Sequence, residues 1–175
     1  MNYVDETISK YEKYINPAQA KLFRFMGLGS IEASAEGWTI TDSEGRQFID
    51  CLGGYGMFAI GHRNPKVVEA VEKELHGMPM CGKVLFNRPM ADLSEALAEI
   101  TPGDLQYSFF VNSGTESVEG CLKVARLATK RPKFVAADNA FHGKTMGSLT
   151  ATGRDLYRDP FQPLLNGFSH VPYGD

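Results

Sequence analysis

The sequence has few features of a membrane or nucleic-acid-binding protein. Its apolar runs are far shorter than the ~20 residues that span a bilayer, so no membrane role is expected. Its net charge is -3, with acids and bases mixed along the chain. It therefore lacks the clustered Lys and Arg that are typical of nucleic-acid binding. Residues 1–17 carry acids and no apolar core, which is not the pattern of a secretory signal.

Cysteine is also scarce. The three cysteines, Cys51, Cys81 and Cys121, are an odd number at unrelated spacings. This pattern favours reduced thiols in a cytoplasmic protein over a disulfide framework or a metal site. Cys81 allows two interpretations, a reactive thiol or a small partly buried hydrophobe, and its surroundings favour the second.

The first 60 residues predict a helical arm and a small β segment. The chain as a whole has the composition of an ordinary soluble globular protein, with 43% hydrophobic and 22% charged residues. Pro17 is expected to break the arm into two helices. Residues 37–51 predict two short strands around a turn. Residues 53–61 hold four glycines, which predicts a loop of close backbone approach rather than a regular element.

Residues 61–175 alternate helical and strand patterns. This alternation is typical of an α/β domain with a mostly parallel sheet. Strand ends and helix starts then share one edge of the sheet, where a ligand would bind. The expected helices cover residues 65–77, 90–101 and 115–129 with a further short helix after residue 140, and the expected strands cover residues 107–111, 133–137 and 168–172.

The segment "YSFFVNSGTESVEGCLKVAR" joins an expected strand directly to an expected helix. A helix N-terminus offers unpaired backbone N–H groups and a partial positive charge. Gly114 would allow a ligand close to the backbone, and Ser113 and Thr115 add hydroxyl donors, which together suit a phosphate group. The alternative is an ordinary capped helix, with Ser113 or Thr115 as the cap and Glu116 or Glu119 in its first turns.

Two nucleotide-binding patterns are incomplete. The segment "DNAFHGKT" resembles a phosphate-binding loop, but Asp138 occupies the position of its first glycine. The segments "GLGSIE" and "GYGMFA" lack the third glycine of a dinucleotide fingerprint. The sequence therefore argues against an NTPase and against a dinucleotide-binding enzyme.

Phe141 and His142 follow an expected strand, so they should reach the same edge as Ser113–Thr115. An aromatic side chain there would stack on a flat heteroaromatic ring. The alternative is a core Phe and a His bonded to backbone. A phosphate cradle beside a stacking aromatic suggests a phosphorylated aromatic cofactor.

The segments "SFFVNSGTESVEGCLKVAR" and "AFHGKTMGSLTATG" resemble the class III aminotransferases, the pyridoxal-phosphate enzymes of the ornithine and GABA aminotransferase group. Upstream, "DSEGRQFIDCLGGYGMFAIGHRNPKVVEAV" is similar to the same family, as is "DPFQPLLNGFSHVPYGD" downstream. Within the family, "FIDCLGG", "GHRNP", "TPGDLQYSFF" and "NSGTESVE" resemble the enzymes that act on putrescine and other diamines. The resemblance covers roughly residues 30–175.

The resemblance implies a fold type I transferase that binds pyridoxal 5'-phosphate. Ser113, Gly114 and Thr115 correspond to the turn that holds the phosphate. Phe141 corresponds to the aromatic on the pyridine ring, with His142 beside it, and Glu119 matches an acid that supports the site. Two further residues, Gly54 and Tyr55, match a segment near the substrate entrance.

The family's Schiff-base lysine and pyridine-binding aspartate have no counterpart here, because the segments that carry them do not occur in this sequence. Lys144 and Asp138 lie in other contexts and receive no catalytic role. The resemblance therefore implies the N-terminal portion of an aminotransferase, with an incomplete large domain over residues 61–175. No catalytic residue is expected in this chain, which should be inactive by itself.

The implied reaction moves an amino group from a terminal diamine or ω-amino acid to a 2-oxo acid such as 2-oxoglutarate. The expected partners are these small substrates, with a second copy in a homodimer or a polypeptide that supplies the missing C-terminal part. A non-catalytic assembly module that completes a partner subunit is the alternative. A simple binder of phosphate ligands is a third possibility.

Overall fold

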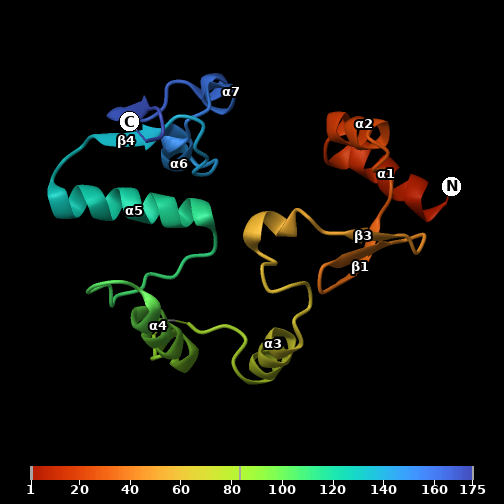
Figure 1. Ribbon diagram of the computed structural model, residues 1–175, viewed down its shortest axis with the longest axis horizontal. Coiled ribbons are helices and arrows are strands. Elements are labelled where there is room, and N and C mark those ends of the chain that lie inside the picture. The colour runs from red at the N-terminus through yellow and green to blue at the C-terminus, as the bar shows by residue number, and fades with distance from the viewer. Residues whose placement is uncertain (1, 83, 175) are drawn as a thin grey trace. The chain divides into compact units, whose positions relative to one another are not determined.

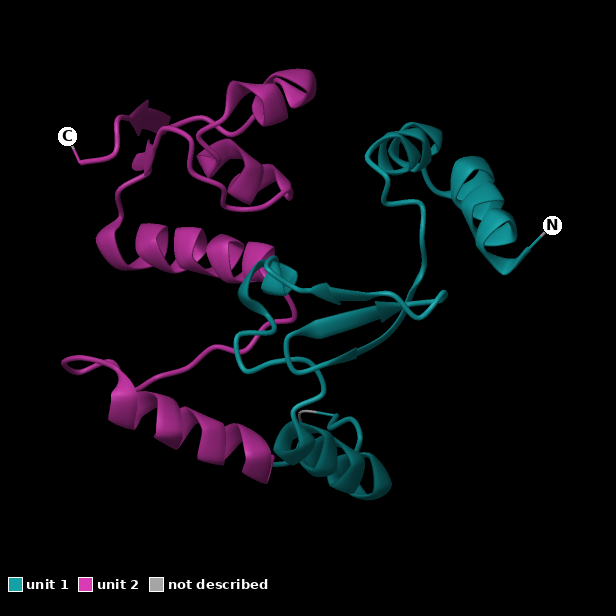
Figure 2. Ribbon diagram, turned by 45° about the vertical axis from the view of Figure 1, so that its right-hand side comes forward, with its two compact units in different colours: residues 1–86 teal, residues 87–175 magenta. Residues whose placement is uncertain are grey.

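The computed structural model describes residues 2–82 and 84–174. The chain divides into two compact units, residues 1–86 (unit 1) and residues 87–175 (unit 2), which Figure 2 colours separately. The expected domain boundary after residue 60 lies within unit 1. Helices and strands alternate in unit 2, so the predicted α/β class is confirmed.

Unit 1 begins with two helices, α1 (Tyr3–Tyr14) and α2 (Pro17–Phe25), which pack against each other. The break between them is where the sequence predicts it. The Asn16 side chain accepts hydrogen bonds from the amides of Ala18 and Gln19 in the first turn of α2. Pro17 has a fixed helical φ and no N–H group that would need an acceptor. Ala20 of α2 is buried.

Three short antiparallel strands follow in the order β1 (Glu32–Glu36), β2 (Thr39–Asp42) and β3 (Gln47–Ile49). β2 and β3 are the two predicted strands around a turn. β1 was not predicted, because its sequence Glu-Ala-Ser-Ala-Glu has no β-branched or aromatic residue. Its pairing with β2 overrides that weak local preference.

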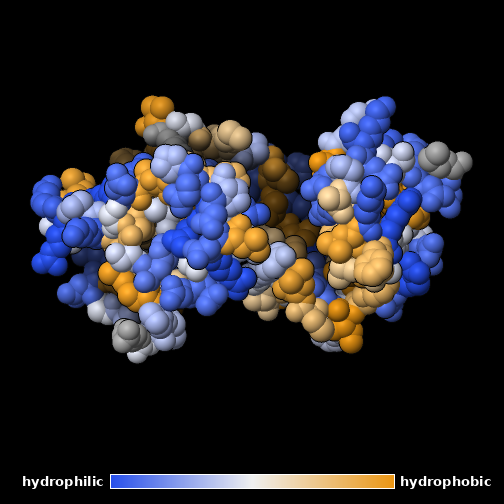
Figure 3. Space-filling view, turned by 90° about the horizontal axis from the view of Figure 1, so that it is seen from above, coloured by the Kyte–Doolittle hydropathy of each residue, from blue (hydrophilic) through white to orange (hydrophobic). Residues whose placement is uncertain are grey.

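The helices α3 (Pro65–Gly77) and α4 (Arg88–Ile100) both begin with an asparagine cap followed by a proline, close to the predicted bounds. Neither helix contains a buried residue. Their apolar stripes stay largely exposed, with Val71 51%, Leu75 58% and Leu93 49% accessible. Figure 3 shows such apolar side chains, in orange, among the polar ones on the surface.

Unit 2 is built around α5 (Gly114–Thr129), β4 (Phe134–Ala137) and α6 (Met146–Ala151) (Figure 1). The helix α7 (Asp155–Arg158) and a 3₁₀ turn, η2 (Asp159–Phe161), lead to β5 (Phe168–Val171). β5 pairs with β4 in parallel, as expected for two strands of a mostly parallel sheet.

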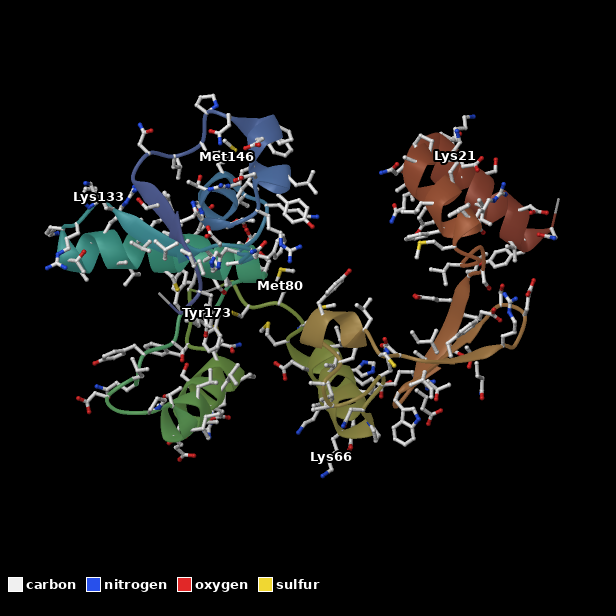
Figure 4. All side chains as sticks on the ribbon, turned by 45° about the horizontal axis from the view of Figure 1, so that its top comes forward. Lys21, Lys66, Met80, Lys133, Met146 and Tyr173 are labelled. Carbon is white, nitrogen blue, oxygen red and sulfur yellow. The ribbon has the colours of Figure 1, made fainter. Side chains whose placement is uncertain are left out.

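The end of α5 is fixed to the start of β4 by Arg126. Its guanidinium donates to the carbonyl of Pro132 over 3.0 Å and lies 5.2 Å from the centre of the Phe134 ring. α5 ends at Thr129, and the C-cap residue Lys130 has a φ of 58°, which lies in the left-handed region. The core of unit 2 is α6, in which every residue except Met146, labelled in Figure 4, is buried.

The predicted strand at residues 107–111 is wrong. This segment is irregular, and Tyr107 and Phe109 are 94% and 82% exposed. A strand needs a neighbour for its backbone groups, and no strand among the described residues pairs with it. Its apolar, aromatic composition led to the prediction, but composition supplies no pairing partner.

No helix in residues 2–82 and 84–174 is both long and apolar enough to cross a membrane. Cys51, Cys81 and Cys121 are all free thiols, as the sequence predicts. The same described ranges hold no cluster of His, Cys, Asp and Glu able to bind a metal ion.

Candidate functional site

The start of α5 is a capped helix N-terminus, which is the alternative that the sequence left open. The amide of Glu116 donates to Ser113 Oγ over 3.3 Å, so Ser113 rather than Thr115 is the cap. The Glu116 carboxylate reaches back and accepts from the amide of Asn112 over 2.6 Å. Each residue thus satisfies a donor at the helix start that would otherwise lack a partner.

Capping does not satisfy every backbone donor at the start of α5. Among the residues that the structure describes, the amides of Gly114 and Thr115 have no hydrogen-bond partner. A Cβ added to Gly114 would meet no atom within 4 Å, so there is open space in front of this turn. A capped turn with two remaining donors and a clear approach has the properties of an anion site.

The Thr115 hydroxyl joins this turn to the loop that follows β4. It lies 2.9 Å from the Thr145 hydroxyl and 2.5 Å from that of Ser148, which is fully buried. Gly143 makes the approach possible, because a Cβ there would stand 2.3 Å from Thr115 Oγ1. The structure therefore brings the turn at residues 113–115 and the loop at residues 141–145 together, within unit 2.

Glu119 lies one turn further along α5, and its side chain caps the N-terminus of the neighbouring helix α6. Its Oε1 accepts from Thr145 Oγ1 at 2.5 Å, the Gly147 amide at 2.9 Å and the Ser148 amide at 3.1 Å. Thr145 is the N-cap residue of α6 but makes no capping bond with its own side chain. The hydrogen bond from Thr145 is the main reason that the pKa of Glu119 lies below its ordinary value.

Thr145 and Ser148 are site residues that the sequence interpretation missed. Three small hydroxyl residues in "GKTMGSLT" were the available signal. Their partners lie about 30 positions away on α5, because the pairs 115–145 and 115–148 are separated by 30 and 33 residues. Such distant pairs are set by tertiary packing, so no local pattern predicts them.

Phe141 lies in the loop that meets the start of α5. The residue is 57% exposed, and its ring meets the Tyr157 ring edge-on, with the ring centres 6.1 Å apart. His142 is half-buried, and its amide donates to Thr152 Oγ1 over 3.0 Å. The loop is thus anchored through its backbone, and the Phe141 ring keeps exposed surface.

The comparison with protein families matches residues 29–175 to the model described as aminotransferase class-III. The chain belongs to the class III aminotransferases. An (S)-enantioselective omega-transaminase from Thermomicrobium roseum is similar over 98% of this chain, with 27% identity and a TM-score of 0.85. A thermostable omega transaminase engineered for asymmetric synthesis of enantiopure bulky amines is 30% identical over 87% of the chain, with a TM-score of 0.76.

An amine transaminase from an uncultivated Pseudomonas species, solved with pyridoxal phosphate bound, is 26% identical over 82% of the chain, with a TM-score of 0.74. This class III aminotransferase chain is shorter than these relatives. It covers 40%, 36% and 34% of the three solved chains, in the order given above. The fold of residues 1–175 is therefore a part of the transaminase fold.

The aminotransferase chain carries Gly54 and Tyr55 in unit 1, whereas the other predicted site residues lie in unit 2. Both belong to the 3₁₀ turn η1 (Gly53–Gly56) and have left-handed backbone angles. The Tyr55 side chain is 90% exposed. A Cβ on Gly54 would stand 2.7 Å from the Phe58 ring, so this position requires glycine.

Proposed function

We propose that this chain holds the phosphate and one face of the ring of pyridoxal 5'-phosphate in a class III aminotransferase. The observation that carries this proposal is the start of α5, where the amides of Gly114 and Thr115 have no partner within residues 2–82 and 84–174 and where a Cβ on Gly114 would meet no atom within 4 Å. Two aligned N–H donors at a helix start fit a phosphate dianion. The residues present therefore fit the cofactor of the family.

In this proposal each residue has a distinct task. The amides of Gly114 and Thr115 donate to phosphate oxygens, and the Ser113 hydroxyl adds a donor while its oxygen caps the helix. Phe141 offers a partly exposed ring as a stacking surface, with His142 beside it. Glu119 keeps the Phe141 loop against α5 through the bonds it makes to Thr145 and α6.

Bound pyridoxal phosphate supplies the electron-withdrawing ring that allows an amino group to pass from an amine to a 2-oxo acid. The family's lysine and aspartate segments do not occur here, so residues 1–175 alone are not expected to transfer amino groups. We propose a terminal diamine such as putrescine, or an ω-amino acid, as the amine, and a 2-oxo acid such as 2-oxoglutarate as acceptor. The similarity of "FIDCLGG" and "NSGTESVE" to diamine enzymes supports this choice. The free thiols support a cytoplasmic setting.

Ligand titration of the 175-residue chain tests the cofactor site. Pyridoxal phosphate should raise the melting temperature and shift the amide resonances of Gly114 and Thr115, because it binds only the folded state. Inorganic phosphate should shift the same resonances more weakly, and pyridoxal should not. No absorbance band of a covalent lysine adduct is expected, and a band that is lost in Lys144→Ala would contradict the absence of a catalytic lysine.

A matched pair of variants sharpens this test. Gly114→Ala fills the space in which the phosphate is proposed to sit. Gly77→Ala, at the end of α3, adds the same methyl group where it also meets nothing within 4 Å. We expect weaker pyridoxal phosphate binding only for Gly114→Ala. Equal binding by both variants would remove the α5 start from the site.

The exposed stripes of α3 and α4 favour a second role, assembly with another polypeptide. Within its own unit, neither helix packs against another described helix or strand. Apolar stripes of this kind mark surfaces that become covered by a partner. We propose a homodimer, or a complex with a chain that supplies the rest of the fold. Light scattering of the purified chain separates these states from a stable monomer.

A further inference from the structure

The glycine-rich loop of unit 1, residues 51–61, is closed at its two ends by one hydrogen bond between the side chains of Asp50 and His62. His62 Nε2 donates to Asp50 Oδ2 over 2.7 Å. Only 12% of the His62 side chain and 9% of the Asp50 side chain are exposed. This hydrogen bond is also the main reason that the pKa of Asp50 is lowered. Water screens such a shielded pair less than an exposed salt bridge.

Both partners are tied to the backbone around them. The second oxygen of Asp50, Oδ1, accepts from the amides of Leu52 at 3.0 Å and Gly53 at 2.9 Å. The backbone of His62 exchanges two hydrogen bonds with Gly37, at 2.7 and 3.1 Å. One carboxylate thus fixes the entrance of the loop through Oδ1 and its exit through Oδ2.

Between these ends the backbone runs through a left-handed turn. Gly53 and Gly54 both have a φ of 56°, and Tyr55 follows at 58°. Glycine adopts this conformation without strain, whereas a tyrosine does so at a cost of about 1–2 kcal/mol. The Phe58 amide closes the turn on the Gly53 carbonyl over 3.1 Å, and the Phe58 ring lies 4.0 Å from that of His62.

We propose that Asp50 and His62 are positioning residues that hold Tyr55 in its left-handed conformation and so present its exposed ring to the amine substrate. Strained residues persist where the surrounding contacts overdetermine them, often at functional sites. The two residues act through the loop and do not contact the substrate. The presentation to substrate rests on the proposed function, whereas the hold on the loop does not.

Limited digestion with chymotrypsin measures this hold on the full 175-residue chain. Cleavage after Tyr55 requires the left-handed turn to open into an extended strand. Mass spectrometry gives its rate relative to cleavage after Tyr107, which lies in the irregular segment of unit 2. His62→Ala should raise this ratio about tenfold, because a hydrogen bond to a charged group is lost.

His76→Ala is the matched control, since His76 lies at the exposed end of α3 in the same unit. The ratio should stay unchanged in this variant. His62→Gln retains a side-chain N–H donor that can reach Asp50 and should restore part of the protection. Protection restored by a glutamine, which has a donor but no ring, would show that the hydrogen bond matters rather than the packing of the His62 ring. Equal ratios in His62→Ala and His76→Ala would overturn the proposal.

If His62→Ala does not fold, hydrogen exchange of the chain without substitutions tests whether the loop is held. The amides of Leu52 and Gly53, which bond to Asp50, should exchange at least about tenfold more slowly than that of Gly54. The Gly54 amide has no partner among the described residues. Equal exchange would refute the hold. No cofactor is present in either experiment, so a failure of pyridoxal phosphate binding leaves their outcomes unaffected.

Discussion

Asp42 in unit 1 and Glu119 in unit 2 are both carboxylates that accept several hydrogen bonds, but they connect different parts of the chain. The oxygens of Asp42 accept from the Ser30 hydroxyl, the Glu44 amide and the amide and side chain of Arg46, at 2.7–2.9 Å. These partners lie no more than 12 positions away. The partners of Glu119 lie 26–29 positions away.

The difference determines what each carboxylate stabilises. Asp42 organises one turn, the one that joins β2 to β3, and that turn is already favoured by its local sequence. Glu119 holds α6 against α5, and α6 contributes most of the buried residues of unit 2. Loss of the Asp42 side chain should therefore destabilise only the turn between β2 and β3, whereas loss of the Glu119 side chain should destabilise the core of unit 2.

Glu119→Ala should produce the largest effect. It leaves two amides and a hydroxyl without their charged acceptor, so the free energy of unfolding of unit 2 should fall by about 3 kcal/mol. Hydrogen exchange at the amides of Gly147 and Ser148 measures this loss. The fluorescence of Trp38, the only tryptophan, reports on unit 1 and should not change.

Two variants serve as controls for that prediction. Glu119→Gln keeps one oxygen acceptor without the charge and should lose only part of the stability. Asp42→Ala should change Trp38 fluorescence and leave exchange at α6 unaffected. If Asp42→Ala also exposes α6, the distinction between a local and a long-range carboxylate is wrong.

Gly147→Ala should have the next largest effect, because its Cβ would stand 2.3 Å from Glu119 Oε2. The carboxylate must move and lengthen its bonds to α6, which should cost about 2 kcal/mol after the gain in helix propensity. The matched variant is Gly45→Ala in the Asp42 turn. There φ is +81° and no atom lies within 4 Å, so only backbone strain of about 1 kcal/mol opposes it. Thermal unfolding monitored by hydrogen exchange measures the loss of stability in each variant. Equal losses in Gly147→Ala and Gly45→Ala would show that the contact with Glu119 is unimportant.

Mild acid should give the smallest effect. Burial alone would raise the pKa of Asp42, but hydrogen bonds from Ser30 and Arg46 outweigh it and hold the pKa well below its ordinary value. The pKa of Glu119 is also lowered. The unfolded chain, with ordinary pKa values of about 3.9 and 4.3, then binds protons first as the pH falls. The stabilising contributions of Asp42 and Glu119 to the free energy of unfolding are complete above about pH 5 and decline as the pH falls below the unfolded-state pKa values.

Acid titration of the two reporters checks this prediction. Trp38 fluorescence should follow the Asp42 contribution, and α6 exchange should follow that of Glu119. In Glu119→Gln the acid dependence of α6 exchange should become shallower while that of Trp38 stays the same. A steeper dependence in this variant would contradict the sign of the Glu119 shift.

Sequence patterns predicted the elements whose signals are local. The start of α2 after Asn16 and that of α5 after Ser113 both depend on a cap and its neighbours, and both were located to within two residues. The segment 107–111 failed because a strand depends on a partner. The meeting of Thr115 with Thr145 was suggested only as a shared sheet edge, and the Glu119 cap on α6 was not foreseen as a contact.

Arg126 gives α5 a second anchor. The last turn of α5 is attached to Pro132 and to Phe134 of β4, while its first turns are attached to α6 through Thr115 and Glu119. A helix that is held near both ends has little freedom to reorient at its first turn. In the function proposed above, the donors of Gly114 and Thr115 would therefore be aligned before the phosphate binds, which reduces the entropy lost on association.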